Sequence, residues 1–191
     1  MTEARPVVVL FARHDSIYKT IPGLDVWDKA RDARQWVGQG PVIAHPPCPQ
    51  WSMLKAFAHD IPEEKEMALW AMGQVRKHGG VLEHPAYSSL WRHPGIRAPK
   101  PREFPDQYGG WSIQVDQWHW GHPARKRTWL YIVGMHPNDL PERPRRKGSP
   151  EYVVSRTSGK FKKPEISHKR REETPPAFAH WLIEVARRCH V

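Results

Sequence analysis

Cysteine is scarce in this chain, and long apolar runs are absent from it. Cys48 and Cys189 are the only two cysteines among 191 residues, which excludes a disulfide framework and predicts a reducing, cytoplasmic setting. No apolar segment approaches the roughly 20 residues that a helix needs to span a bilayer. Residues 1–6 lack the apolar core of a signal peptide, so we expect a soluble protein that is not exported by that route.

Acidic residues are also in short supply. The chain has 30 lysines and arginines against 20 aspartates and glutamates, a formal net charge of +10. Such a surplus predicts a polyanionic partner, DNA above all. The 10 tryptophans are an excess for this length; some must fill the core, and tryptophan beside arginine and lysine also suits stacking on bases. An ordinary soluble domain with a basic surface is the alternative.

Apolar runs alternate with amphipathic segments, in a chain whose length fits a single domain over residues 1–191. Strands are predicted at residues 7–11, 24–27, 41–44, 81–83, 113–120 and 129–133. Helices are predicted at 15–20, 28–36, 60–78 and, capped by Thr174, at 175–189. Residues 136–171 are basic and predicted irregular. This order indicates an α/β three-layer sandwich with a mainly parallel sheet and an antiparallel hairpin.

The most informative stretch is His45-Pro46-Pro47-Cys48-Pro49-Gln50-Trp51-Ser52, directly after a predicted strand. Proline fixes its own φ and restricts the residue before it, so the two prolines place Cys48 on a stiff loop. Glu83 ends another predicted strand. In parallel sheets, ligands bind beyond the carboxyl ends of the strands. A thiol held there in so basic a chain predicts a nucleophile, with Glu83 nearby.

A thiol and a carboxyl group are what modification of a pyrimidine ring requires. Carbon 5 is inert until a nucleophile adds to carbon 6, and an acid at nitrogen 3 assists that addition. Cys48 and Glu83 satisfy this need if they reach the same base. Glu83 would then be protonated or share a proton with the base, which burial favours and Arg125 or Arg127 opposes.

Four segments resemble the DNA cytosine-5 methyltransferases, and they occur in that family's order between about residues 7 and 188. Pro46-Pro47-Cys48-Pro49-Gln50-Trp51-Ser52 resembles the nucleophile motif PPCQPFS with proline and glutamine exchanged. Glu83-His84-Pro85 resembles the Glu-Asn-Val motif. Gly121 to Thr128, with Leu130 to Gly134, is similar to the GxPQxRxR segment and its strand, and the helix after Thr174 resembles the closing motif. The closest resemblance is to short, phage-type members.

The resemblance implies a Rossmann-like, methyltransferase-type fold and a set of roles. Cys48 would be the nucleophile and Glu83 the base-activating acid, while Arg125 and Arg127 would bind the base carbonyl or DNA phosphates. S-adenosylmethionine would be the methyl donor. The residues implied at the donor site are Phe11, Asp28, Pro46 and Thr174, and those at the DNA are Ser52, Lys126, Arg145 and Arg146. Such enzymes rotate the target base out of the duplex.

The chain departs from the family's pattern at three places. The first strand is followed by Arg13-His14-Asp15-Ser16 instead of a glycine-rich turn, which is poorly suited to close approach of the backbone to a cofactor. The closing motif lacks its Gly-Asn pair, and about 30 to 40 irregular residues replace a target-recognition domain. The donor therefore stays open, as does the choice between cytosine and uracil or thymine.

Several alternatives remain open. One alternative is a DNA-binding relative without catalysis. Another is an enzyme that acts on free pyrimidine nucleotides. Cys48 alone is compatible with a small buried apolar residue, and Glu83 with a structural ion pair. Among the histidines and cysteines, His45, Cys48, His84, His119 and His122 lack the tight spacing of a metal site, so no metal site is predicted.

Overall fold

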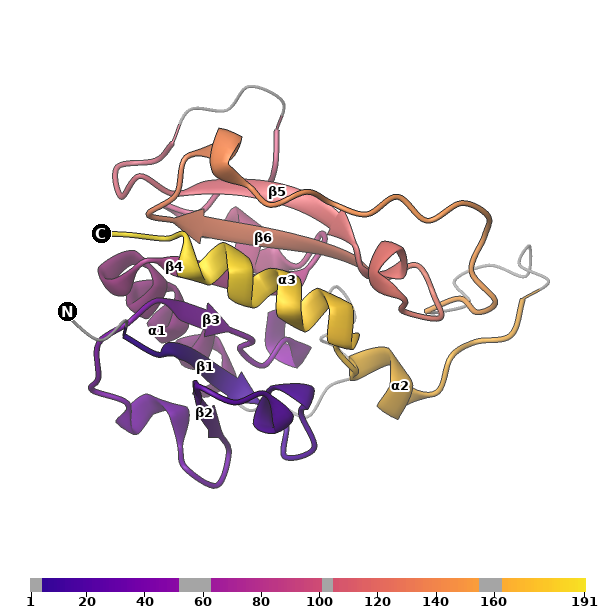
Figure 1. The fold of residues 1–191 in the computed structure, drawn as a ribbon, viewed down its shortest axis with the longest axis horizontal. Coiled ribbons are helices and arrows are strands. Elements are labelled where there is room, and N and C mark those ends of the chain that lie inside the picture. Colours follow the sequence, from indigo (N-terminus) through magenta and orange to yellow (C-terminus); the bar gives the residue numbers. More distant parts are fainter. Residues whose placement is uncertain (1–4, 52–62, 101–104, 155–162) are drawn as a thin grey trace.

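A six-stranded sheet forms the centre of the computed structural model, which describes residues 5–51, 63–100, 105–154 and 163–191 (Figure 1). Its strands lie in the order β2-β1-β3-β4-β6-β5. They span β1 Val7–Ala12, β2 Leu24–Asp28, β3 Val42–Ala44, β4 Gly80–Pro85, β5 Trp111–Asp116 and β6 Arg127–Val133. Strands β1 to β4 pair in parallel, and β6 is antiparallel to both β4 and β5. The predicted mainly parallel sheet and antiparallel hairpin are therefore confirmed.

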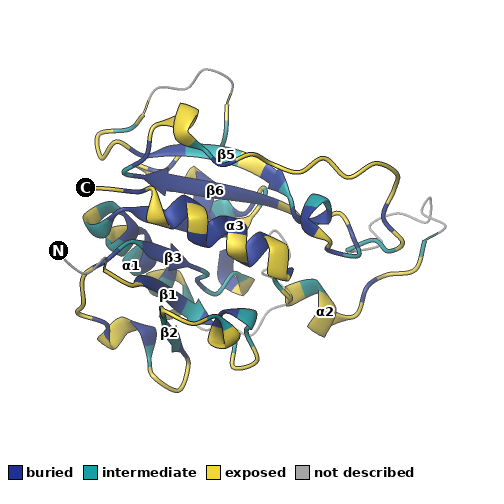
Figure 2. Cartoon of the chain, in the orientation of Figure 1, coloured by how far each residue is buried: buried dark blue, intermediate teal, exposed yellow. Residues whose placement is uncertain are grey.

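One helix covers each face of the sheet. Helix α1, Glu63–His78, packs against β3, β4 and β6, and α3, Pro176–Arg187, packs against β1, β3 and β4 on the other face. Successive residues of β1 enter opposite cores, with Val7 and Val9 on the α3 side and Val8 and Leu10 on the α1 side. Figure 2 shows α3 buried against the sheet and exposed on its outer side. The result is a three-layer α/β arrangement.

The predicted helices differ from the structure mainly at their ends. Single 3-10 turns, Ile17–Thr20 and Ala33–Gln35, occupy parts of the segments predicted as short helices. Another 3-10 turn, Gln117–Trp120, replaces the end of the fifth predicted strand, because the Asp116 carboxylate accepts the Trp118 N–H at 3.1 Å. The predicted helix over 60–78 is confirmed as α1; residues 60–62 lie outside the described residues.

In the C-terminal third one expectation was wrong, and the expectation of a mostly irregular basic segment agrees with the described residues. Thr174 does not cap α3: its N-cap is Pro175, which makes no side-chain cap hydrogen bond. The basic segment is irregular over most of its described length but contains a short helix, α2 (His168–Glu172), whose cap Ser167 accepts the Arg170 N–H. In Figure 1, α2 lies just beyond the N-terminus of α3.

The sheet brings one set of strand ends together. Because β1 to β4 are parallel and β6 is antiparallel to β4 and β5, the carboxyl ends of β1 to β5 share an edge with the start of β6. We call this the carboxyl edge; in Figure 1 it faces right, away from both chain ends. No helix within the described part of the chain is long and apolar enough to span a membrane.

Candidate active site

Cys48 and Glu83 extend from neighbouring strands at the carboxyl edge. Ala44 of β3 pairs with Leu82 of β4, and Glu83 is the next residue of β4, so the cysteine loop that follows β3 begins beside Glu83. Cys48 is partly exposed, and its carbonyl accepts the Trp51 N–H at 3.1 Å. Burial, and then the negative charge of Glu83, raise the pKa of the Cys48 thiol to about 11. The predicted pair therefore lies within electrostatic range.

Hydrogen-bond donors hold the Glu83 carboxylate from two sides. His45 Nδ1 lies 3.0 Å from Oε2, and Gln117 Nε2 donates to Oε1 at 3.2 Å. Gln117 also donates to the Thr128 hydroxyl at 2.9 Å. Burial alone would raise the pKa of Glu83, but the hydrogen bond from His45 and the nearby positive charges outweigh it and lower the pKa to about 2. Glu83 is therefore ionised at neutral pH.

The charge of Lys126 acts on both members of this pair. Lys126 is partly buried, and its Nζ donates to the Glu173 carbonyl at 3.1 Å. Burial lowers the pKa of Lys126, and the charges of Glu83 and Cys48 raise it in part. The same Lys126 charge lowers the pKa of Cys48. The thiol, the carboxylate and the ammonium group therefore form one electrostatic cluster.

The two arginines that the resemblance assigned to the base lie elsewhere. Arg125 is exposed, pairs with Asp116 at 3.2 Å, and has its guanidinium 5.3 Å from the centre of the Trp118 ring. Arg127 is exposed at the start of β6. Alternation at this strand end leaves Lys126 partly buried and Arg125 and Arg127 exposed, and the charge of Glu83 raises the pKa of Lys126. The structure thus brings Lys126, and not Arg125 or Arg127, to the predicted pair.

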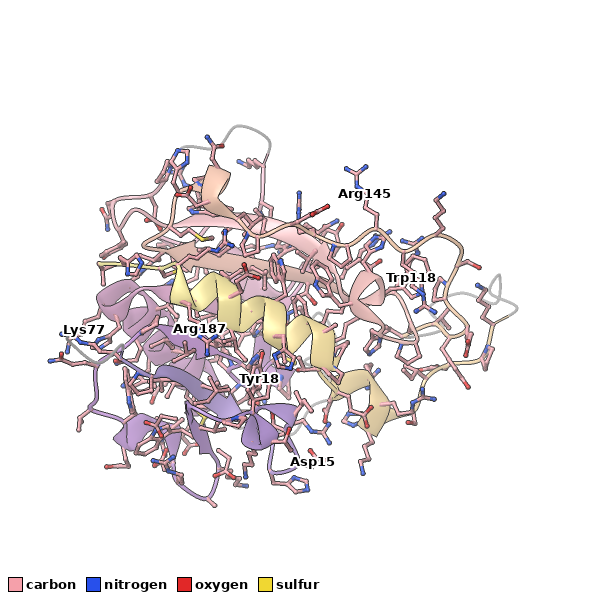
Figure 3. The ribbon with its side chains drawn as sticks, in the orientation of Figure 1. Asp15, Tyr18, Lys77, Trp118, Arg145 and Arg187 are labelled. Carbon is pink, nitrogen blue, oxygen red and sulfur yellow. The ribbon has the colours of Figure 1, made fainter. Side chains whose placement is uncertain are left out.

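Helix α2 covers part of the carboxyl edge. Arg13, directly after β1, pairs with Asp15 and with Glu172 of α2, both at 2.9 Å, and donates to the Lys169 carbonyl at 3.2 Å. The negative charge of Glu172 also raises the pKa of Cys48. Figure 3 shows Asp15 close to α2. Residues 169–173 are therefore held beside the thiol by Arg13 and Lys126.

Three of the residues implied for S-adenosylmethionine, Phe11, Asp28 and Pro46, lie at or just after the ends of the neighbouring strands β1, β2 and β3. Phe11 packs edge-on against Trp70 of α1, with ring centres 5.9 Å apart. Asp28 accepts the Ala30 and Arg31 N–H groups through Oδ1 and pairs with Lys19 through Oδ2, so both oxygens are already engaged within the protein. Pro46 is buried.

The turn after β1 does not fit that donor either. Where the family has glycines, Arg13 forms ion pairs with Asp15 and Glu172 directly after the strand. A turn without glycine is poorly suited to a close approach of the backbone to a cofactor. The residues present do not fit S-adenosylmethionine as the resemblance places it.

Thr174 lines a cavity of about 450 Å³ beside the N-terminus of α3. Trp120 and His122 form one side, and Arg170 and Glu173 form another. Because the Glu173 carbonyl accepts the Lys126 ammonium group, the cavity adjoins the cluster of Cys48, Glu83 and Lys126. Its lining combines Trp120 and three prolines with the charged residues Arg170 and Glu173.

Two of the residues predicted to contact DNA, Arg145 and Arg146, lie on an exposed basic segment near Trp118. Arg145 is exposed, and the Arg146 guanidinium lies 5.1 Å from the centre of the Trp118 ring. The Arg146 N–H donates to His119 Nδ1 at 3.1 Å. Figure 3 labels Arg145 and Trp118 on this side of the molecule. Ser52 lies outside the described residues, among which no group of three or more metal-ligating side chains is arranged to hold a metal ion.

Sequence reasoning missed Tyr18 and Gln117, which belong to the Glu83 network. Tyr18 comes from the 3-10 turn after β1, and Gln117 follows β5, so only the folded sheet brings them to Glu83. The strand-end position of Gln117 was the one available signal. No family model, curated protein or solved structure matches this chain.

Proposed function

We propose that this protein adds the Cys48 thiol to carbon 6 of a cytosine in DNA and so activates carbon 5 toward an electrophile. The observation that carries the proposal is the electrostatic cluster of Cys48, Glu83 and Lys126 at one edge of a parallel sheet. A sheet of parallel strands with antiparallel β6 inserted between β4 and β5 is compatible with a Rossmann-like, methyltransferase-type fold.

The ionised Glu83 favours cytosine over uracil or thymine. When Cys48 adds to carbon 6, nitrogen 3 of cytosine gains a proton, and the ring then offers two N–H donors, at nitrogen 3 and at the amino group. A carboxylate accepts both, because it carries only acceptors. Uracil and thymine place a carbonyl oxygen where cytosine has its amino group, and that oxygen would face a negative carboxylate oxygen.

The step balances without an external acid. The thiol is protonated at neutral pH because its pKa is about 11, so formation of the Sγ–C6 bond releases one proton and nitrogen 3 gains one. Lys126 stabilises the thiolate during the transfer, and it supplies positive charge for the ring carbonyl on which negative charge develops. Cys48 is therefore the nucleophile, Glu83 the partner of the protonated ring and Lys126 the stabilising cation.

DNA is the proposed partner because the exposed cations continue from the carboxyl edge along the hairpin side. Arg125, Arg127, Arg145 and Arg146 are all exposed or partly stacked on Trp118. Contacts between these arginines and DNA phosphates would neutralise charge without identifying bases. The proposal names no donor for carbon 5, because the residues implied for S-adenosylmethionine do not fit it. Two free cysteines favour a reducing, cytoplasmic setting.

Hydrogen exchange at carbon 5 tests this proposal without a donor. Reversible addition of Cys48 lets carbon 5 take up a deuteron from heavy water, which adds one mass unit to deoxycytidine in digested DNA. We expect exchange with wild type and with the matched variant Cys189→Ser, and none with Cys48→Ser. Absence of exchange with wild-type protein on single- and double-stranded DNA would refute the proposal, and exchange on free nucleotides alone would replace DNA as the substrate.

The high pKa of Cys48 favours one second candidate, a DNA-binding protein without catalysis. Such a protein would bind DNA equally well after Cys48→Ala. It would also produce no exchange at alkaline pH, where the thiolate becomes populated. The pH series of the exchange experiment therefore separates the two candidates.

A further inference from the structure

The His45 side chain bridges two residues that are far apart in the sequence. Its Nδ1 lies 3.0 Å from Glu83 Oε2, and its Nε2 lies 3.2 Å from the Tyr18 hydroxyl. The His45 N–H donates to the Leu10 carbonyl at 3.0 Å and extends the pairing of β3 with β1 by one residue. The backbone and both ring nitrogens of His45 are thus fixed between β1 and β4.

The chemistry of the partners assigns a direction to the first of these hydrogen bonds. An ionised carboxylate only accepts, so Nδ1 must donate to Glu83. Burial, and then the charge of Glu83, raise the pKa of Tyr18 well above its ordinary value, which keeps its hydroxyl protonated. The second ring nitrogen, Nε2, is hydrogen-bonded to the Tyr18 hydroxyl, in a direction that follows the tautomer. A continuous chain of hydrogen bonds therefore links Tyr18, His45 and Glu83, and its last member is donated to the carboxylate.

We infer that His45, oriented by Tyr18, is a positioning residue that holds Glu83 ionised and aimed at the base. The inference rests on the proposed function and explains how a carboxylate so far removed from water keeps its charge. Only 14% of the Glu83 side chain is exposed, and burial without compensating donors would favour the neutral acid. His45 and Gln117 each fix one oxygen, which leaves the remaining lone pairs for the protonated ring.

Every charged or titratable group around Glu83 bears on this inference. Lys126 lies at the start of β6, Cys48 follows β3, and His84 is the next residue of β4; Tyr18 approaches from the turn after β1. Lys126 favours the ionised form, as His45 does. Loss of the His45 N–H should therefore raise the pKa of Glu83 without neutralising it completely.

The test measures the protonation of Glu83 separately from the reaction. Protein labelled with ¹³C at the glutamate carboxyl groups is titrated by NMR, and Glu83→Gln identifies the resonance. In His45→Ala we expect the Glu83 midpoint to rise by about one unit or more and carbon 5 exchange at neutral pH to fall about 10- to 100-fold. His45→Asn keeps an N–H near the Nδ1 position and should restore most of both. The exposed His180→Ala is the matched control.

The outcomes separate this inference from the proposed function. Tyr18→Phe removes one hydroxyl and should reduce exchange about 3-fold while His45 still donates to Glu83. An unchanged Glu83 midpoint in His45→Ala would overturn the inference. A shifted midpoint with no exchange in the wild type would support the positioning of Glu83 by His45 and refute the proposed reaction.

Discussion

The two cysteines lie at opposite ends of the sheet and differ in their neighbours. Burial raises the pKa of both thiols, to about 11 for Cys48 and about 12 for Cys189. Cys189 is 3% exposed, and its sulfur lies 3.8 Å from the Gly80 carbonyl oxygen. Cys48 instead lies among charged side chains, one of which, Lys126, lowers its pKa. Burial is thus common to both, and the charged neighbours distinguish a candidate nucleophile from a packing residue.

The backbone shows the same contrast. At the carboxyl edge two non-glycine residues adopt left-handed conformations, Phe11 with φ of 60° and Tyr87 with φ of 66°. At the opposite end Gly79 and Gly80 take such positions, and a Cβ on Gly80 would lie 2.0 Å from the Val42 carbonyl oxygen. Glycine also takes a positive φ at the carboxyl edge, at Gly121 with φ of 101°, so the contrast rests on Phe11 and Tyr87, which keep side chains at such positions near the candidate site.

Neutralising one carboxylate at each end gives the largest expected contrast. Glu83→Gln removes the charge that stabilises the protonated ring, so carbon 5 exchange should fall about 100- to 1,000-fold. Asp106 accepts the Tyr131 hydroxyl at 2.6 Å at the opposite end. Asp106→Asn should lower the free energy of unfolding and leave the exchange rate of the folded protein unchanged. Equal losses of exchange in both variants would contradict the division between the two ends.

Acid unfolding should depend on Glu83 in a predictable direction. Its pKa is lowered to about 2 in the folded protein, against about 4.3 in an unfolded chain. The ionised group therefore stabilises the fold above about pH 4.3, and this contribution, on the order of 3 kcal/mol, is lost as the pH falls toward 2. Urea unfolding at a series of pH values should show a shallower acid decline for Glu83→Gln than for wild type. Parallel curves would show that Glu83 is not held ionised.

Removing the Lys126 charge should slow the alkylation of Cys48. The thiolate is the reactive form, and loss of a nearby cation raises the thiol pKa further, so the rate with iodoacetamide near pH 8 should fall about 10-fold in Lys126→Met. The exposed Lys147→Met is the matched control. Mass spectrometry should find Cys189 unmodified in the native protein, because it is buried. Faster modification of Cys189 than of Cys48 would reverse the comparison.

The sequence predicted the features that depend on local pattern. The apolar runs at Val7–Val9 and Val42–Ala44 form parallel strands, so the position of Cys48 after a strand was predictable from local pattern. Glu83 was predicted to end its strand, but β4 continues to Pro85 because Glu83, His84 and Pro85 all pair with β6.

Which of Arg125, Lys126 and Arg127 lies near Cys48 and Glu83 could not be predicted from local pattern. It depends on the register of β6, where Thr128 pairs with Pro85. Both faces of β6 are buried, so hydrophobic alternation does not indicate which side chains face the site.

Contacts between distant segments were equally inaccessible. His45 appeared in the sequence analysis only as a possible metal ligand, because its partners Tyr18 and Glu83 are 27 and 38 residues away. Helix α2 has five residues, too few to be stable alone; its pairing with Arg13 is a tertiary contact. These features depend on how the loops meet at the carboxyl edge, and local propensity does not encode that.

The smallest expected effect measures the strain at the carboxyl edge directly. At Tyr87 a left-handed φ penalises any side chain, so Tyr87→Gly should be more stable than Tyr87→Ala by about 1 kcal/mol. Gly73 is an exposed position within α1, where an added Cβ would meet open space. At this position alanine should be more stable than glycine, so Gly73→Ala should stabilise the protein by about 1 kcal/mol. Chemical denaturation of the three variants and wild type gives both differences. If the alanine variant is the more stable one at both positions, Tyr87 carries no backbone strain. The two ends of β4 would then not differ in backbone strain.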